Sequence, residues 1–330
     1  MWGNLIGWII SAAIALAMGF LLYVVVRPPA PTPPTGAAVV AIAQKPIALP
    51  VSPVSVVAAG TEDCDAGTLY REAIKKYLAD PIPYERFSGP SGATKVKREE
   101  MAAIEDVVKA TRCGKKFTLF SAKPGELVNY DNNHPSLHAI NEVGNILCTV
   151  GRLDILNKNY DEAKKLCEAA FQLGTRLQGE RVSWAELADG LGIMQSAAKN
   201  LKDIAEEQGD RERRDTVGDF MVAEGQYQIK LIEAYKIIGA IDEGYAGPYA
   251  GDIFSIAKNS QADPMFRVEA FKHIGHYKYN ARTKGDQLAA KKVLAASATD
   301  PGLDPIVKTA AVAAHDLTPE QHNMVGGSVE

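Results

Sequence analysis

Two histidine pairs have spacings that bring side chains to one face of a helix. His134 and His138 lie four residues apart, as two metal ligands on a helix would. His134 also falls at the expected cap of a helix that begins at Pro135, so we favour a structural role for it. His273 and His276 share a segment packed by Phe271 and Ile274, and we expect them on its polar surface. We predict no metal site.

A glycine-rich aromatic segment is the clearest candidate for binding a ligand. Residues 244–251 read GYAGPYAG, in which Tyr245 and Tyr249 could hold a peptide or glycan by stacking. The alternative is a plain turn between two helices, which Gly and Pro also favour.

Motifs that define common catalytic sites are missing. The sequence contains no HExxH, GxSxG, Walker loop, CxxC or GxGxxG after a strand. We therefore assign no catalytic residue, cofactor or metal ligand, and expect a protein that acts by binding.

The four cysteines bear on the compartment. Cys148 and Cys167 lie about equally far from an expected turn at Lys158-Asn159, so an antiparallel helical hairpin would bring them together. Cys64 and Cys113 flank the first helical section and form the second potential disulfide. Buried free thiols would explain the same positions. Pairing would favour an oxidising compartment, and we expect a periplasmic domain.

The first 27 residues predict a membrane anchor. The run from Leu5 to Val26 is 22 residues without a charge, enough to cross a hydrocarbon core of about 30 Å as a helix. A cleaved signal peptide is the alternative, but the run is longer than a signal core and no Lys or Arg precedes it. We expect a single-pass protein of the inner membrane.

Small residues recur at every fourth position of this anchor. They form a stripe on which a second membrane helix could pack closely, although the segment is rich in Ala and Gly throughout. The stripe consists of Gly3, Gly7, Ser11, Ala15 and Gly19.

A proline-rich linker follows the anchor. Residues 28–60 contain eight prolines, one charge at Lys45 and no acidic residue, which is typical of a semi-rigid extended spacer. Its apolar patches leave open whether it is free or partly docked on the folded domain. Residues 61–330 carry all 40 acidic residues and 34 of the 36 basic ones, so a general nucleic-acid binder is excluded.

Helical patterns dominate the rest, and we expect an all-α domain. Between Gly114 and Tyr130 the helical period fails, and a Lys-Pro-Gly turn there predicts a small β-hairpin or an extended crossing. The segment Tyr160-Asp161-Glu162-Ala163, followed by Ala169, Ala170 and Leu173-Gly174, resembles part of a tetratricopeptide (TPR) unit. This resemblance implies helical hairpins over residues 61–255, without assigning ligand residues.

An internal repeat lies nearer the C-terminus. The segments that begin at Asp263-Pro264 and at Asp304-Pro305 align without gaps, 41 residues apart, as D-P-x-[F/V]-[R/K]-x-x-A. The period and pattern resemble HEAT repeats, which implies stacked helical hairpins over residues 256–317. In each copy Asp caps a helix whose first residue is Pro. We expect a tail over residues 318–330.

The sequence thus predicts an anchor (1–27), a linker (28–60) and an α-solenoid-like domain. We expect a membrane-anchored scaffold that binds protein partners, or further copies of itself, in a cell-envelope assembly. The alternative is a cell-envelope enzyme or accessory subunit that acts on peptidoglycan or another glycan. A perturbed carboxyl in a tight pocket would favour the enzyme, and an open groove would favour the scaffold.

Overall fold

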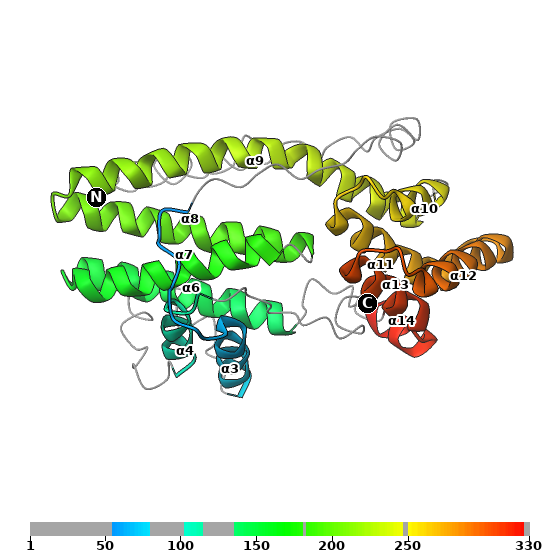
Figure 1. The fold of residues 1–330 in the computed structure, drawn as a ribbon, viewed down its shortest axis with the longest axis horizontal. Helices are drawn as coiled ribbons and strands as arrows, with labels where there is room; N and C mark the ends of the chain where they lie inside the picture. Colours follow the sequence, from blue (N-terminus) through cyan, green and yellow to red (C-terminus); the bar gives the residue numbers. More distant parts are fainter. Residues whose placement is uncertain (1–54, 80–101, 115–134, 181–182, 247–249, 327–330) are drawn as a thin grey trace, which may run out of the picture.

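The computed structural model describes residues 55–79, 102–114, 135–180, 183–246 and 250–326 of the 330-residue chain (Figure 1). These residues are helical and form no sheet; a single isolated bridge joins Glu62 and Cys113. The all-α prediction therefore holds for them. The helices are α3 (Ala66–Ala79), α4 (Ala102–Ala110), α6 (Pro135–Leu156), α7 (Tyr160–Glu180), α8 (Trp184–Glu207), α9 (Arg211–Ala246), α10 (Ala250–Lys258), α11 (Pro264–Asn280), α12 (Lys284–Thr299), α13 (Pro305–Asp316) and α14 (Pro319–Gly326).

Helices α6 to α9 form a stack of antiparallel rods joined by short turns (Figure 1). Two of these turns pass through left-handed backbone, at Lys158 before α7 and at Gly209 before α9. Helix α6 contacts both α7 and α8, and α8 in turn contacts α9. At the α7–α8 crossing a Cβ on Gly174 would lie 2.5 Å from the carbonyl oxygen of Gly190, so the close approach requires glycine.

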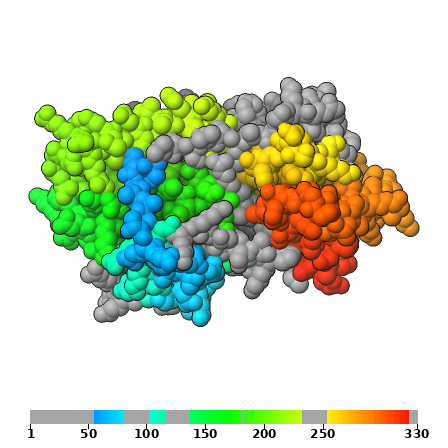
Figure 2. All heavy atoms as spheres, viewed as in Figure 1, coloured from blue at the N-terminus to red at the C-terminus, as the bar shows by residue number. Residues whose placement is uncertain are grey.

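The N-terminal segment packs across this stack. Residues 55–65 run over the green helices in Figure 2, and Gln172 on α7 donates to the carbonyl of Ala58 at 2.5 Å. The segment then joins α4 through the disulfide between Cys64 and Cys113 and through a backbone bond from Glu62 N to Arg112 O (2.8 Å). Helices α3 and α4 pack on each other, α3 on α6 and α4 on α7.

Arg176 on α7 anchors this N-terminal unit. Its guanidinium donates to the Tyr70 hydroxyl on α3 (2.9 Å) and to the carbonyls of Ala110 (2.9 Å) and Cys113 (2.6 Å) at the end of α4. Tyr70, Ala110 and Cys113 are buried. Carbonyls in the last turn of a helix lack their regular intrahelical partner, so Arg176 adds donors at the end of α4, where the Ala110 carbonyl also accepts from Cys113 N (3.1 Å).

The C-terminal half contains the 41-residue repeat, and both copies begin alike. Asp263 accepts from Met265 N (3.1 Å) at the start of α11, and Asp304 accepts from Ile306 N (3.0 Å) at the start of α13. The expected Asp-Pro helix starts are therefore confirmed. The aligned apolar and alanine positions are fully buried, at Phe266, Val307, Ala270 and Ala311.

Helix α9 connects the two halves, because it contacts α8 at one end and α10 and α11 at the other (Figure 1). A polar link adds to this connection. Glu269 on α11 accepts from the backbone N–H of Trp184 (3.3 Å) at the start of α8, and Lys272 pairs with the same carboxylate at 3.1 Å. One continuous hydrophobic core runs through both halves.

Several expectations fall on other parts of the chain. The anchor, most of the linker and the hairpin predicted between Gly114 and Tyr130 lie outside the described residues. Within the described ranges, no helix has the length and apolar character needed to cross a bilayer. Of the expected tail, residues 319–326 form α14, which packs on α11.

We expect the Arg176→Met variant to lose about 3 kcal/mol of unfolding free energy, because it removes the charge-assisted hydrogen bonds that Arg176 makes to the Tyr70 hydroxyl and to the carbonyls of Ala110 and Cys113. Denaturant unfolding followed by circular dichroism measures the loss. Lys165→Met, on the exposed side of the same helix, is the matched control. Equal stability of the two variants would show that Arg176 does not anchor α3 and α4.

Candidate functional site

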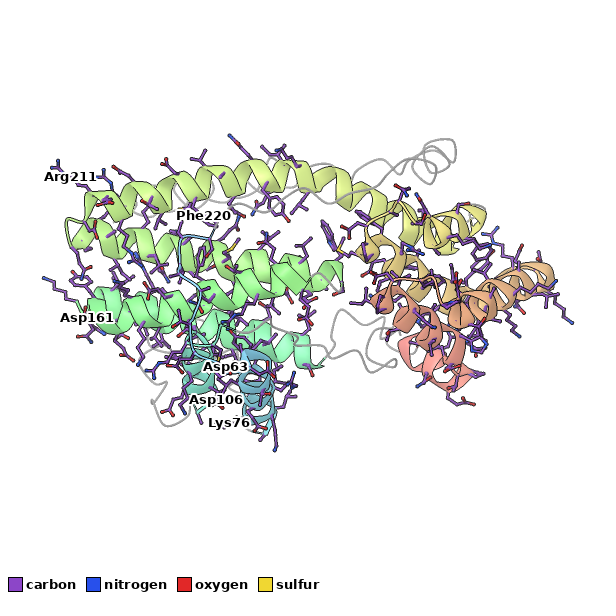
Figure 3. The ribbon with its side chains drawn as sticks, in the orientation of Figure 1. Asp63, Lys76, Asp106, Asp161, Arg211 and Phe220 are labelled. Carbon is purple, nitrogen blue, oxygen red and sulfur yellow. A yellow bond between two sulfur atoms is a disulfide. The ribbon has the colours of Figure 1, made fainter. Side chains whose placement is uncertain are left out.

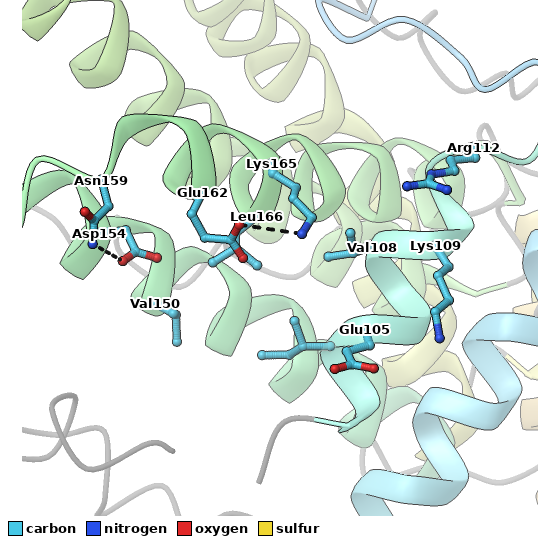
Figure 4. Close-up of a pocket in the computed structure, with 11 residues that line it drawn as sticks. Glu105, Val108, Lys109, Arg112, Val150, Asp154, Asn159, Glu162, Lys165 and Leu166 are labelled. Carbon is cyan, nitrogen blue, oxygen red and sulfur yellow. Dashed lines mark hydrogen bonds and ion pairs between the residues drawn. The ribbon is translucent and has the colours of Figure 1, made fainter. Parts of the chain in front are cut away.

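A groove of about 610 Å³ lies between α4, the end of α6 and the start of α7 (Figure 4). We call it the α4–α7 groove. Its apolar lining comes from all three helices, through Ile104, Val108, Val150 and Leu166. Six charged residues share the lining with them: Glu105, Lys109, Arg112, Asp154, Glu162 and Lys165. The arrangement combines an apolar surface with charges of both signs.

The charges are ordered along the groove. Figure 4 shows Asp154 at one end, where Asn159 donates to it at 3.3 Å. Glu162 and Lys165 form an ion pair of 3.6 Å in the middle. Arg112 and Lys109 project from α4 at the opposite end. Asp154 makes one end acidic, and Arg112 and Lys109 make the other mainly basic, with Glu105 beside Lys109.

Helix α4 forms one wall of the groove and is held firmly in place. Arg176 and the Cys64–Cys113 disulfide fix its C-terminal end. On its other face, the buried carboxylate of Asp106 accepts from Lys76 of α3 at 2.5 Å, and Figure 3 shows these two side chains together. The groove is thus preorganised by contacts that lie outside it.

A second cavity, of about 600 Å³, lies between α6 and α8. Its lining includes the polar residues Asn145, Thr149, Arg152, Lys199 and Asn200 beside Ile146 and Leu153. Several of these groups already serve the helix contact, because Arg152 forms an ion pair with Asp203 and Asn200 donates to the Cys148 carbonyl at 2.8 Å.

Asp189 on α8 is the most perturbed carboxyl near these cavities. Burial raises its pKa to about 6; His138 acts to lower the pKa and Glu142 to raise it further. Asn141 donates to Asp189 Oδ1 at 3.2 Å. The carboxyl could exchange a proton near neutral pH, but it lines neither of the two cavities.

The two cysteine pairs differ in the structure. Cys64 and Cys113 form a disulfide. Cys148 and Cys167 remain free thiols in place of the predicted second disulfide. Both thiols are buried, and burial raises the pKa of Cys167 to about 12 and that of Cys148 still further. Such thiols are poor nucleophiles and act as small core residues.

The expected surface position of His273 and His276 is wrong, because both are buried in α11. His276 Nδ1 lies 2.8 Å from His322 Nδ1 on α14, and His322 Nε2 lies 2.6 Å from Asn280 Oδ1. The amide oxygen can only accept, so His322 carries its proton on Nε2 and accepts at Nδ1 from His276. The histidines therefore attach α14 to α11.

The remaining candidates lie partly or wholly beyond the described residues. Tyr245 falls in the last turn of α9, and Tyr249 and the stripe of Gly3, Gly7, Ser11, Ala15 and Gly19 are outside them, as is His134. No group of three or more His, Cys, Asp or Glu side chains suited to a metal ion occurs within the ranges that the structure describes.

Comparison with known protein families, curated proteins and solved structures finds no match to this chain. The functional argument therefore depends on the geometry of the site itself.

Sequence reasoning missed the α4–α7 groove because its walls come from segments about 50 residues apart. It also missed Arg176 and Asp189. The sequence does carry a signal for Arg176. It is a cation next to the apolar face of α7 that Leu173 and Leu177 define. A charge bordering such a face often serves a neighbouring element.

We expect acid to release α14. Burial and the nearby charge of Lys278 lower the pKa of His322 below its usual value of 6.5, and Glu320 is the nearby acid on α14. The contact between His276 and neutral His322 contributes stability above the pKa of histidine in the unfolded chain. This stability is lost as the pH falls through the lowered pKa of His322 in the folded protein. Hydrogen exchange of residues 319–326 should accelerate as the pH falls below 6.5, beyond the intrinsic effect of pH.

His322→Gln removes the titrating group and should remove this excess acceleration. His315→Gln, at an exposed histidine on α13 that pairs with Asp316, should retain it. Excess acceleration that persists in the His322 variant would contradict the assignment.

We also expect Asp189→Asn to stabilise the protein at neutral pH. The folded pKa of Asp189 is raised, so the carboxylate opposes folding increasingly as pH rises from about 4 to above 6. The amide retains an oxygen that can accept from Asn141. Thermal unfolding should give the variant the higher Tm at pH 7 and nearly the same Tm at pH 4. An equal difference at both values would contradict the burial argument.

Proposed function

We propose that this chain is a membrane-anchored α-helical scaffold whose α4–α7 groove binds an extended segment of a partner protein. The observation that carries the proposal is the groove itself, which joins apolar side chains from three helices to charges of both signs. Grooves of this size that mix apolar contact with a few polar groups are typical binding sites.

The order of charges defines the partner segment. Asp154 at one end favours a basic side chain. Arg112 and Lys109 at the other favour an acidic one, although Lys109 also lies 3.7 Å from Asp106 of its own helix. Between them, Val108, Val150 and Leu166 suit aliphatic residues. The segment therefore has a basic and an acidic end around an apolar centre, and its direction in the groove follows from charge complementarity.

The helix contacts support a solenoid-like architecture. In α6–α9 each hairpin packs on the next, with α6 touching both α7 and α8, as stacked TPR-like hairpins would. In the C-terminal half α11 contacts α12 and α13, and the two Asp-Pro helix starts support a HEAT-like pair. Scaffolds of this kind bind through surface complementarity.

The sequence and the disulfide support the proposed location. Residues 5–26 would anchor the chain in the inner membrane by a single span, and the linker would separate the domain from the bilayer. The Cys64–Cys113 disulfide supports a periplasmic domain, because disulfides persist in oxidising compartments. The scattered and net negative charge gives no support to nucleic-acid binding.

The alternative function, an envelope enzyme or accessory subunit acting on a glycan, has one observation in its favour. Asp189 has a raised pKa and lies near His138 and Glu142. Its position away from both cavities weighs against this alternative. Loss of glycan cleavage in Asp189→Asn with full partner binding would favour the enzyme.

The scaffold proposal is tested by reversing the basic end of the groove. We expect Lys109→Glu combined with Arg112→Glu to reduce partner recovery at least tenfold, because an acidic segment would then meet two like charges. Tagged full-length protein is purified in mild detergent, and quantitative mass spectrometry compares the chains that co-purify with wild type and variant.

Lys291→Glu combined with Lys292→Glu is the matched control, since it makes the same change of charge on exposed residues of α12. The control should recover the same partner as wild type. Equal recovery by the groove variant and the control would contradict the proposed site, provided that both variants unfold at the wild-type denaturant concentration.

A further inference from the structure

Helix α9 carries two stripes of mainly apolar residues on opposite sides, and only one of them faces the protein. The buried stripe alternates by three and four residues through Val217, Phe220, Glu224, Tyr227 and Leu231. Figure 3 shows Phe220 directed toward α8, and its ring lies 5.1 Å from that of Phe171 on α7. This stripe attaches α9 to the stack.

The second stripe consists of Gly218, Val222, Gly225 and Ile229. Its spacing of four, three and four residues is the heptad spacing of helices that pair along their length. Val222 is 63% exposed and Ile229 67% exposed, so two β-branched side chains face solvent one heptad apart. We call these four residues the outer stripe.

Glycine at the two remaining positions requires an explanation. A glycine within a helix costs roughly 1 kcal/mol relative to alanine. A Cβ placed on Gly218 or Gly225 would meet no atom within 4 Å, so nothing inside the described structure requires glycine there. Close approach of a second helix would account for both positions.

We propose that the outer stripe is an interface with a second copy of this chain, in which the two α9 helices pack antiparallel around a two-fold axis near Gly225. In this arrangement Val222 packs against Ile229 of the partner subunit. Gly218 and Gly225 let the two backbones approach closely.

The positions of two charged residues support antiparallel pairing of α9 with α9 of a second copy. Asp219 and Lys230 are exposed and lie on the same flank of the outer stripe, three helical turns apart. The two-fold axis that pairs Val222 with Ile229 also brings Asp219 close to Lys230 of the partner subunit. In a parallel pair the same flank of the two copies would lie on opposite sides of the interface, so Asp219 would not meet Lys230 of the partner subunit.

The contact is small compared with a standard interface of about 1,600 Å². We therefore expect it to be weak for separate molecules in solution. An anchor in the same membrane would raise the local concentration of the copies and favour pairing. The inference stands independently of the α4–α7 groove, and changes in the groove should leave it intact.

Disulfide cross-linking of the full-length chain in its native membrane tests both pairing and direction. Gly225→Cys, near the axis, should cross-link to itself under mild oxidation. Val222→Cys and Ile229→Cys should each remain uncross-linked alone, because identical positions lie about 10 Å apart along the paired helices. Co-expression of these two variants should give the mixed dimer.

Leu288→Cys, at an exposed leucine of α12, is the control for random collision and should not cross-link. Val222→Asp combined with Ile229→Asp should abolish the Gly225→Cys dimer, and Leu288→Asp should leave it unchanged. No cross-linking above the Leu288→Cys control would overturn the interface. Self-cross-linking of Val222→Cys without a mixed dimer would overturn the antiparallel arrangement.

Discussion

The packing of these helices depends on side chains that donate hydrogen bonds to the carbonyl groups at buried helix ends. Three cations on neighbouring helices meet this need. Arg176 serves the end of α4, Arg267 donates to the Ala257 carbonyl near the end of α10 (3.1 Å), and Lys278 donates to Ala314 (2.8 Å) and His315 (2.7 Å) at the end of α13. Unpaired carbonyls in a dry interior cost as much as several good contacts provide. Each cation therefore determines where one helix ends against another.

The sequence predicted features that depend on neighbouring residues in the chain. Asp263-Pro264 and Asp304-Pro305 mark helix starts because cap and first residue are adjacent. The turn at Lys158-Asn159 follows from the interruption of the helical pattern. Features that depend on distant residues were not accessible in this way. His273 and His276 looked like surface residues because α14, which covers His276, begins more than 40 residues later.

The candidate site illustrates the same limit. Val108 on α4 and Leu166 on α7 line one groove, but no local pattern relates them. Their meeting depends on Arg176 and on the Cys64–Cys113 disulfide, which bring α4 against α7. The predicted pairing of Cys148 with Cys167 used correct hairpin geometry, yet both remain buried thiols. Proximity across a hairpin is therefore necessary for a disulfide but is not sufficient.

The repeat also has an electrostatic consequence. Helices α11 and α13 pack on each other, and Lys278 in the last turn of α11 donates to carbonyls at the end of α13, so the partial negative ends of the two helices lie together. Lys278 lies between these ends and offsets the repulsion, although burial lowers its pKa to about 8. A third parallel helix would need the same counter-charge from α13. The position 41 residues after Lys278 is Pro319, the first residue of α14, which cannot provide it. The counter-charge of the first copy therefore has no equivalent at the aligned position of the second.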